Sequence, residues 1–119
     1  MINYVQKGEV IDFVAAADVV SGQVVAIGNI LGVACAAVAN GATGKAAIRG
    51  VFTVPKVSAA VIANGESLTW DVSAAAFDVN AATPATGDIT GAPAVAFEAA
   101  GNGVTSMKVL FTGVPGTKT

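Results

Sequence analysis

The stretch that decides the fold class reads KAAIRGVFTV and occupies positions 45–54. Apolar side chains alternate with charged, hydroxyl or small ones along it, which is the period of an extended strand with one buried face. Gly50 interrupts the alternation and is predicted to form a β-bulge. The stretch therefore predicts the longest strand of the chain. Its buried face is predicted to hold Ala46, Ile48, Phe52 and Val54.

The same alternation recurs later in the chain. Residues 67–72 place Leu68, Trp70 and Val72 on one face, with Ser67, Thr69 and Asp71 opposite. Residues 93–99 put Val95 and Phe97 together. This period of two predicts several short strands, each half-buried. In residues 104–111 the predicted inward face consists of Met107, Val109 and Phe111, with Lys108 opposite.

Composition and turn signals agree with strands. The chain has 19 valines and 7 isoleucines but only 3 leucines, and branching at Cβ disfavours helix while suiting a pleated sheet. Gly28-Asn29 separates two apolar runs and predicts a hairpin turn. Pro55 ends the pairing of the long strand, and residues 56–63 are predicted to form one short helical turn. We therefore expect an all-β fold: a small β-sandwich or β-barrel with one short helical turn.

The chain length of 119 residues indicates one hydrophobic core. No internal repeat is present. We expect an N-terminal arm at 1–8, a single β domain at 9–112 and a loose C-terminal tail at 113–119.

The charge pattern excludes several partners. Only 12% of the residues are charged, the net charge is −2, and the six basic residues are scattered. Nucleic acid needs a basic stripe, so it is not an expected partner. The longest apolar run, 30–39, is about half of a bilayer span, and the N-terminus lacks the pattern of a secretory signal. We expect a protein that is made in the cytoplasm and does not bind membranes.

The side chains that carry most enzyme chemistry are missing. The chain has no histidine and one cysteine, Cys35, so His-based triads and a zinc site built on several cysteines are impossible. Cys35 lies between alanines and is predicted to be a buried thiol. The eight carboxylates are spread along the chain and are expected to serve turns and caps. We predict no catalytic residue, no metal and no cofactor, although a hydrolase with two carboxylates stays open.

Residues 41–46, GATGKA, look like part of a phosphate-binding P-loop. Such a loop needs glycine at position 39 and serine or threonine at position 46, and both positions hold alanine. The following residues are predicted as strand, so no helix N-terminus is expected to hold phosphate. The segment is interpreted as a turn that enters a strand.

The order of several motifs resembles a phage and prophage family that was long labelled "predicted RecA/RadA family phage recombinase" and whose members are now regarded as capsid cement, or decoration, proteins. The similarity covers nearly the whole chain, and the pair GVFTVPK and LTWD is its most specific part. The motifs are Asn3–Glu9, Ser21–Val25, Gly28–Ala34, Gly50–Lys56, Leu68–Asp71 and Met107–Leu110.

The resemblance implies a structural virion protein that binds the major capsid protein on the outside of the head and stabilises contacts between its subunits. It also implies an all-β homotrimer without enzymatic activity. The recombinase label disagrees with the missing nucleotide site. An alternative is a small β-barrel module that binds carbohydrate or nucleic acid, which scattered charge and few aromatic residues disfavour.

The N-terminal arm is the segment predicted to contact the capsid or a neighbouring subunit. It carries apolar side chains, yet Gly8 separates it from the first alternating strand. A short free arm gains too little from burial to offset its backbone entropy, so it becomes ordered on a partner. An edge strand folded on its own domain is an equally supported alternative. The predicted contact residues are Ile2, Tyr4, Val5 and Lys7.

Overall fold

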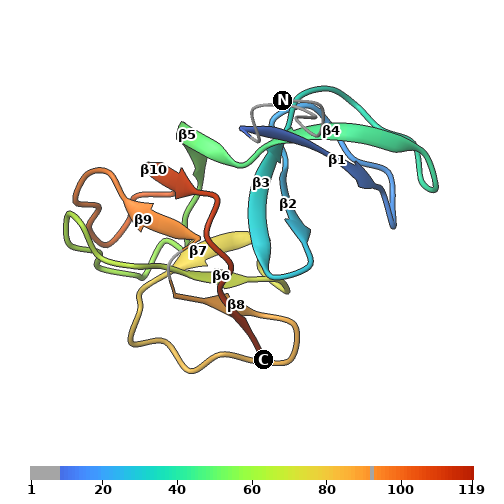
Figure 1. Cartoon of the computed structure of the whole chain (residues 1–119). Coiled ribbons are helices and arrows are strands. Elements are labelled where there is room, and N and C mark those ends of the chain that lie inside the picture. The colour runs from blue at the N-terminus through green and yellow to red at the C-terminus, as the bar shows by residue number, and fades with distance from the viewer. Residues whose placement is uncertain (1–8, 92) are drawn as a thin grey trace, which may run out of the picture.

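The computed structural model of the chain describes residues 9–91 and 93–119. Within these ranges the chain forms eleven strands and no helix, which confirms the all-β class (Figure 1). The strands belong to three antiparallel sheets. In chain order they are β1 Val10–Val14, β2 Val24–Ile27, β3 Ile30–Ala34, β4 Thr43–Ala47, β5 Arg49–Pro55, β6 Thr69–Asp71, β7 Ala76–Asp78, β8 Ile89–Thr90, β9 Ala94–Ala96, β10 Ser106–Thr112 and β11 Thr117–Lys118.

The first sheet has the strand order β1-β4-β3-β2. Its β2–β3 hairpin confirms the predicted turn, since Ile27 pairs with Ile30 across Gly28 and Asn29. Gly28 has a φ of 61°, which a type II′ turn requires at its first central residue and which glycine adopts without strain. The turn chemistry thus sets the register of this hairpin.

The stretch 45–54 is divided between two sheets, so its prediction as one strand is wrong. Strand β4 pairs with β1 in the first sheet, whereas β5 pairs with β10 in the second. Between them, the Ile48 amide donates to the Glu9 carbonyl at 2.9 Å. Gly50 has a φ of 129°, which only glycine adopts readily, so the chain turns away from the first sheet here. The predicted inward side chains nevertheless stay buried, except that Phe52 is half-buried.

The second sheet has the order β5-β10-β9. Strand β10 shows the predicted alternation, because Met107, Val109 and Phe111 are buried while Lys108 and Leu110 are exposed. Lys108 lies opposite Thr53 of β5 in the register. One face of this sheet therefore covers the core and the other faces outward.

The third sheet has the order β11-β8-β6-β7. In this sheet, Trp70 pairs with Phe77 across β6 and β7. The turn between them forms because the Asp71 carboxylate accepts hydrogen bonds from the Ser73 and Ala74 amides at 3.1 and 3.2 Å, as in an Asx-turn. This turn returns the chain and brings Phe77 into the core.

The C-terminal residues 113–119, predicted to be a loose tail, carry strand β11. It pairs with β8, and the Thr119 amide donates to the Asp88 carbonyl at 2.9 Å. The Gly116 amide also donates to the Asn29 carbonyl at 2.8 Å. Backbone pairing to an otherwise free edge of β8 holds this segment in the third sheet.

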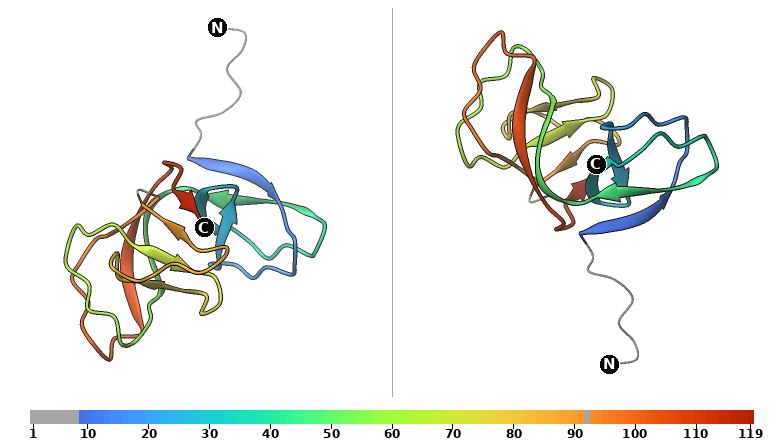
Figure 2. Two further views of the ribbon diagram at one scale, coloured as in Figure 1. Left: turned by 90° about the horizontal axis from the view of Figure 1, so that it is seen from below. Right: turned by 90° about the horizontal axis from the view of Figure 1, so that it is seen from above.

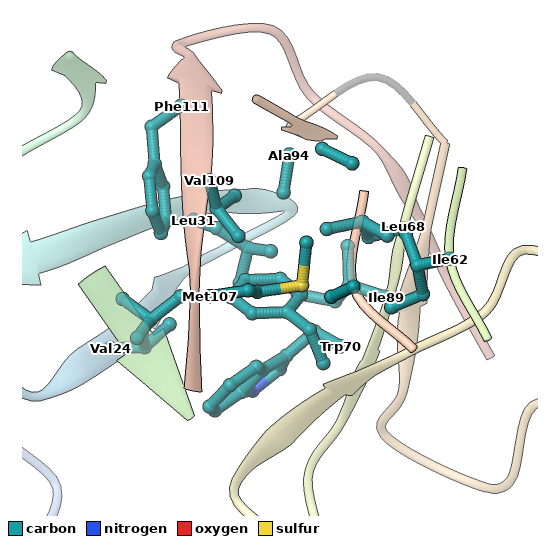
Figure 3. Packing of buried hydrophobic residues seen from close by; sticks show 14 of the residues in the cluster. Val24, Leu31, Ile62, Leu68, Trp70, Ile89, Ala94, Met107, Val109 and Phe111 are labelled. Carbon is teal, nitrogen blue, oxygen red and sulfur yellow. The ribbon is translucent and has the colours of Figure 1, made fainter. Parts of the chain in front are cut away.

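Two hydrophobic clusters lie in the described residues, so the single core expected from the chain length is wrong. The larger cluster lies between the second and third sheets, which we together call the body, and includes Trp70, Phe77 and Phe111 (Figure 3). The smaller cluster lies within the first sheet around Phe13. Strands β2 and β3 serve both, because their alternating side chains point to opposite faces. Val24, Leu31 and Val33 belong to the larger cluster, while Val25 and Ala34 belong to the smaller.

Several predicted burials and one predicted element are wrong. Residues 56–63 form a β-turn rather than a helical turn: the Ala60 amide donates to the Val57 carbonyl at 3.1 Å, while bridges at Lys56 and Ile62 keep the flanking chain extended. Cys35 is exposed: it follows the last residue of β3 at the end of the strand, where its amide still donates to the Lys45 carbonyl at 2.9 Å but its side chain is not covered. Three other side chains differ: Val72 is exposed just after β6, Phe97 is exposed just after β9, and Thr69 is buried.

Candidate interaction surfaces

The carboxylates serve local structure rather than a shared site. Seven of the eight accept a hydrogen bond, six of them from a backbone amide and one from Lys45. Asp88 is the most buried of them and accepts from the Val72 and Ala85 amides at 3.1 and 2.9 Å. Among the described residues, no three histidine, cysteine or acidic side chains gather as a metal site would need. The predicted local roles therefore hold for most of these groups, whereas Asp12 pairs with Lys45 between strands β1 and β4.

In the part of the chain that the structure describes, two charged groups have shifted pKa values, both on the surface. The pKa of Asp71 is lowered, chiefly by the hydrogen bond from the Ser73 hydroxyl and also by the Ala74 amide. The pKa of Lys45 is raised by its hydrogen bond and ion pair with Asp12, whose carboxylate lies 2.8 Å from the Lys45 ammonium. Both shifts stabilise the charged form of a group in a strand or turn, and neither lies in a cleft.

The P-loop-like segment has the backbone that the sequence predicts. Gly41 lies in a turn with a φ of 82°, and Thr43–Ala47 is strand β4. Lys45 points to the surface and pairs with Asp12. The segment is therefore a turn followed by a strand, and its lysine is engaged by a carboxylate instead of lying over a phosphate cradle.

An apolar groove of about 620 Å³ runs between the first sheet and the body. On one side lie the end of β1 and the chain that follows it, with Val14 and Val20 exposed. On the other side lie Pro55 and Val72, and the buried Trp70 closes the floor. None of the lining residues is charged. We call this feature the groove; it offers apolar contact without any ionic group.

A second apolar surface lies on the outer face of the second sheet. Leu110 pairs with Val51 on one side and with Val95 on the other, so these three side chains form a row across the sheet. Val51 and Leu110 are exposed, and Val95 is partly so. Phe97 continues this face beyond β9 and is 52% exposed. Exposed aliphatic and aromatic groups in a row are typical of a protein contact.

The contact residues predicted from the sequence, Ile2, Tyr4, Val5 and Lys7, lie outside the described residues. Sequence reasoning missed both the groove and the outer face of the second sheet. The alternation of Val95 and Phe97 did indicate a shared face, but a period of two does not tell which face is covered. Val14 and Val20 carried no signal, since the groove combines segments that are far apart in the sequence.

Comparison with known protein families agrees with a protein that acts through its surfaces. Within the described residues, the structure contains no helical segment long and apolar enough to span a bilayer. No curated protein matches the chain with significant sequence similarity. The sequence pattern of the phage cement protein family, however, matches residues 5–111, which is nearly the whole chain and includes all strands from β1 to β9 and most of β10. The chain therefore belongs to the phage cement protein family.

Proposed function

We propose that this structural virion protein binds the outside of a phage head and stabilises contacts between major capsid protein subunits. The observation that carries the proposal is the apolar, uncharged groove together with the row of exposed apolar side chains on the outer face of the second sheet, next to Lys108. Exposed apolar patches of this kind mark interaction sites rather than the free surface of a monomer. The family supports the same role, since cement proteins are structural components of the virion.

The low charge of these surfaces suits a protein that holds neighbouring capsid subunits together. A surface without ionic groups can be covered without the desolvation cost that buried charges bring. Burial of apolar area contributes about 25 cal/mol per Å², so each exposed valine adds a modest amount. Many copies on one shell act together, and such multivalency converts modest contacts into firm attachment. The protein thus acts through repeated surface contact, as a homotrimer on the capsid exterior after synthesis in the host cytoplasm.

We infer that the protein does this without catalysis. Seven of the eight carboxylates accept hydrogen bonds from backbone amides or from Lys45 rather than pairing with one another across a cleft. The groove is lined by no charged residue and so offers no acid or base of that kind. Its shape and chemistry fit an apolar segment of another protein chain.

A binding module for carbohydrate or nucleic acid is disfavoured. Such sites use exposed aromatic rings in groups, and among the described residues Phe97 is the one exposed aromatic side chain. The basic residues are spread over the chain, and one of the six, Lys56, is buried. Weak, non-saturable retention on glycan arrays and on single-stranded DNA is the expected result.

The N-terminal arm is proposed as one capsid contact, through Ile2, Tyr4, Val5 and Lys7. Deletion of residues 1–7 is expected to leave the thermal midpoint unchanged while decoration of expanded capsids falls. A matched variant with Ile2, Tyr4 and Val5 changed to Ser keeps the length of the arm. A large drop in the midpoint for either variant shows instead that the arm belongs to the folded core.

Cryo-microscopy of capsids with and without the protein tests the main proposal. We expect extra density on the exterior, over junctions between capsid subunits, and a higher melting temperature for the decorated shell. Density inside the shell, or binding without any gain in shell stability, contradicts the proposal. The variant Val51→Asn/Leu110→Asn, on the outer face of the second sheet, tests whether that face contributes.

A further inference from the structure

Three of the six asparagines of the chain are followed by glycine. In such a pair the glycine amide nitrogen can attack the asparagine Cγ, because glycine has no side chain to hinder the approach. The bond from nitrogen to Cγ forms, the bond from Cγ to Nδ2 breaks, and the amide proton leaves with ammonia. Water then opens the resulting succinimide to aspartate or isoaspartate, which adds a negative charge. The pairs are Asn40-Gly41, Asn64-Gly65 and Asn102-Gly103.

The glycine amides of all three pairs are engaged, although the pairs themselves are exposed to water. Each amide donates to a carbonyl of a distant loop, so the attack has to break this bond before the nitrogen can lose its proton and turn toward Cγ. Gly41 donates to Ala15 at 2.8 Å, Gly65 to Ala96 at 2.9 Å and Gly103 to Ser58 at 2.7 Å.

The first of these bonds belongs to a pair of loops beside the first sheet, residues 15–23 and 34–42, which we call the first double turn. At its centre Val19 and Val38 exchange two backbone bonds, at 2.8 and 2.9 Å. The glycine three positions after each valine donates to the carbonyl four positions before the other valine. These glycines are Gly22, which donates to Ala34 at 2.9 Å, and Gly41.

The same arrangement recurs in the body, in residues 58–66 and 96–104, which we call the second double turn. Ile62 and Ala100 take the places of the two valines and exchange bonds at 2.8 and 3.0 Å. Figure 2 shows the two double turns at opposite ends of the molecule. The repeat is not visible in the sequence, because the four loops share little beyond a glycine after serine or asparagine. These glycines are Gly22, Gly41, Gly65 and Gly103, with φ of 85°, 82°, 80° and 91°.

The buried Lys56 ammonium holds the last of the three asparagine-glycine pairs. It donates to the Gly101 and Val104 carbonyls, on either side of this pair, at 3.0 and 3.1 Å. It also donates at 3.3 Å to the Ser58 carbonyl, which is the acceptor of the Gly103 amide. Because Lys56 is 3% exposed, water competes little for these carbonyls. The ammonium therefore positions both the attacking peptide and its acceptor.

Carboxylates hold the other two pairs. The Asp18 carboxylate accepts from the Asn40 amide at 2.9 Å and so links the two loops of the first double turn. The Glu66 carboxylate accepts from the Ala63 and Asn80 amides at 3.3 and 2.9 Å, which fixes the turn that contains the second pair. Both carboxylates are more exposed than the lysine. Each pair thus has its own charged residue beside it.

We propose that Asn40, Asn64 and Asn102 are latent deamidation sites, which the two double turns keep unreactive by holding the attacking glycine amides in hydrogen bonds. The rate at each site is set by the fraction of molecules in which that double turn is open. The inference goes beyond the proposed function and does not depend on what the protein binds. The residues that position the three sites are, in the same order, Asp18, Glu66 and Lys56.

Incubation of the full-length protein in mildly alkaline buffer, with and without urea, tests the protection. Peptide mapping by mass spectrometry follows each site separately. We expect all three sites to react at least about tenfold more slowly in the native protein than in the unfolded chain. Asn29 and Asn80 are the reference sites, because neither is followed by glycine. A native protein that deamidates at the three sites as fast as the unfolded chain overturns the proposal.

The variant Ser21→Asn tests whether the repeat itself gives the protection. It creates a fourth asparagine-glycine pair at the equivalent place of the first double turn, where the Gly22 amide already donates to the Ala34 carbonyl. We expect the new pair to react readily in urea and to be protected in the native protein as the other three are. Rapid reaction of the new pair in a folded Ser21→Asn protein contradicts the proposal.

The variant Lys56→Met tests the positioning of the third site. We expect the rate at Asn102 to rise roughly tenfold, which corresponds to about 1.4 kcal/mol of lost protection, while the rate at Asn40 stays unchanged. Lys108→Met is the matched control, because this lysine is exposed on β10, and it is expected to change no site. A general loss of stability raises the rate at all sites together, and such a result contradicts the positioning role.

The variants Asp18→Ala and Glu66→Ala test the other two sites, and they keep the test decisive if Lys56→Met does not fold. Since water screens these exposed contacts, we expect a rise of about threefold, at Asn40 for the first variant and at Asn64 for the second. Thermal midpoints are measured in parallel to show that each variant is folded. No rise at the matching site, an equal rise at every site, or slower reaction at Asn40 without Asp18 overturns the assigned roles.

Discussion

The larger cluster, in the body, packs aliphatic side chains around three buried aromatic rings, whereas the smaller cluster, in the first sheet, consists of valine and alanine around the single ring of Phe13. In the body, Phe77 lies between Trp70 and Phe111, with ring centroids 4.9 and 5.9 Å away. In the first sheet, Ala46 is fully buried, and Gly44 has Val38 directly over its backbone. One region fills space with large side chains, and the other leaves little free space because a valine side chain packs directly on the backbone of a glycine.

This difference predicts which kind of substitution lowers the stability of each region. A cluster of rings is sensitive to the loss of volume, because the cavity left behind is not refilled. A cluster held by close backbone approach is sensitive to added volume, because a new methyl group meets atoms that cannot move far. Strand β3 couples the two, since Leu31 and Val33 enter the larger cluster and Ala34 the smaller.

The largest effect is expected for Phe77→Ala in the body. Phe77 is fully buried between two other rings, so its truncation is expected to lower the free energy of unfolding by about 3–5 kcal/mol. Urea titration followed by Trp70 fluorescence measures it. Phe97→Ala is the control, because this exposed ring is expected to cost less than about 0.5 kcal/mol. A similar decrease in the free energy of unfolding for both variants would contradict the contrast between the core and the surface.

Gly44→Ala is expected to have the next largest effect, now in the first sheet. The added Cβ would overlap Val38, a stiff β-branched side chain. We therefore expect the free energy of unfolding to fall by about 1–3 kcal/mol. Val38→Ala in the same chain should restore part of it. Gly101→Ala is the control, because its added Cβ meets open space. Amide exchange should rise at Val19 and Val38, which bond each other across this cluster, more than at Val109 of the body.

A smaller effect is expected at the β6–β7 turn of the body on acidification. Because the pKa of Asp71 is lowered from 3.8 by the Ser73 hydroxyl, its stabilising contribution is present above pH 3.8 and is lost as the pH falls through the lower pKa of the folded state. Solvent screening limits it to about 0.5 kcal/mol. Asp71→Asn should therefore be less stable than wild type at neutral pH, and the difference should vanish in acid. A difference independent of pH contradicts this.

The smallest effect on stability is expected in the first sheet at high pH, where Lys45 loses its charge. The pKa of Lys45 is raised above 10.5 by Asp12, so its contribution is present below pH 10.5 and is lost as the pH rises through the pKa of the folded state. NMR titration of the Lys45 side chain in wild type and Asp12→Asn measures it. A pKa that is the same in both proteins contradicts the ion pair.

Much of the fold could be predicted from local patterns. The alternation predicted in residues 104–111, the Gly28-Asn29 turn and the burial of Trp70 depend on neighbours close in sequence; the turn and the burial are present in the structure, and the alternation is present in β10, Ser106–Thr112. The all-β class follows from the same local preferences, because Cβ-branched side chains favour extended backbone wherever they occur. The capsid contacts predicted in the arm, Ile2, Tyr4, Val5 and Lys7, stay a prediction.

Other features were decided only by tertiary structure. A period of two predicts two faces but does not tell which one is covered, so Phe97 and Val72 were assigned to the core although the body leaves them exposed. The division of residues 45–54 at Ile48 depends on the chain leaving one sheet for another. A lysine is expected on the surface; the burial of Lys56 required carbonyls from a loop more than forty positions later in the chain. Sequence alone therefore determined the all-β class and several of the strands and turns, whereas the groove and the buried ammonium arise from contacts between segments that no local pattern connects.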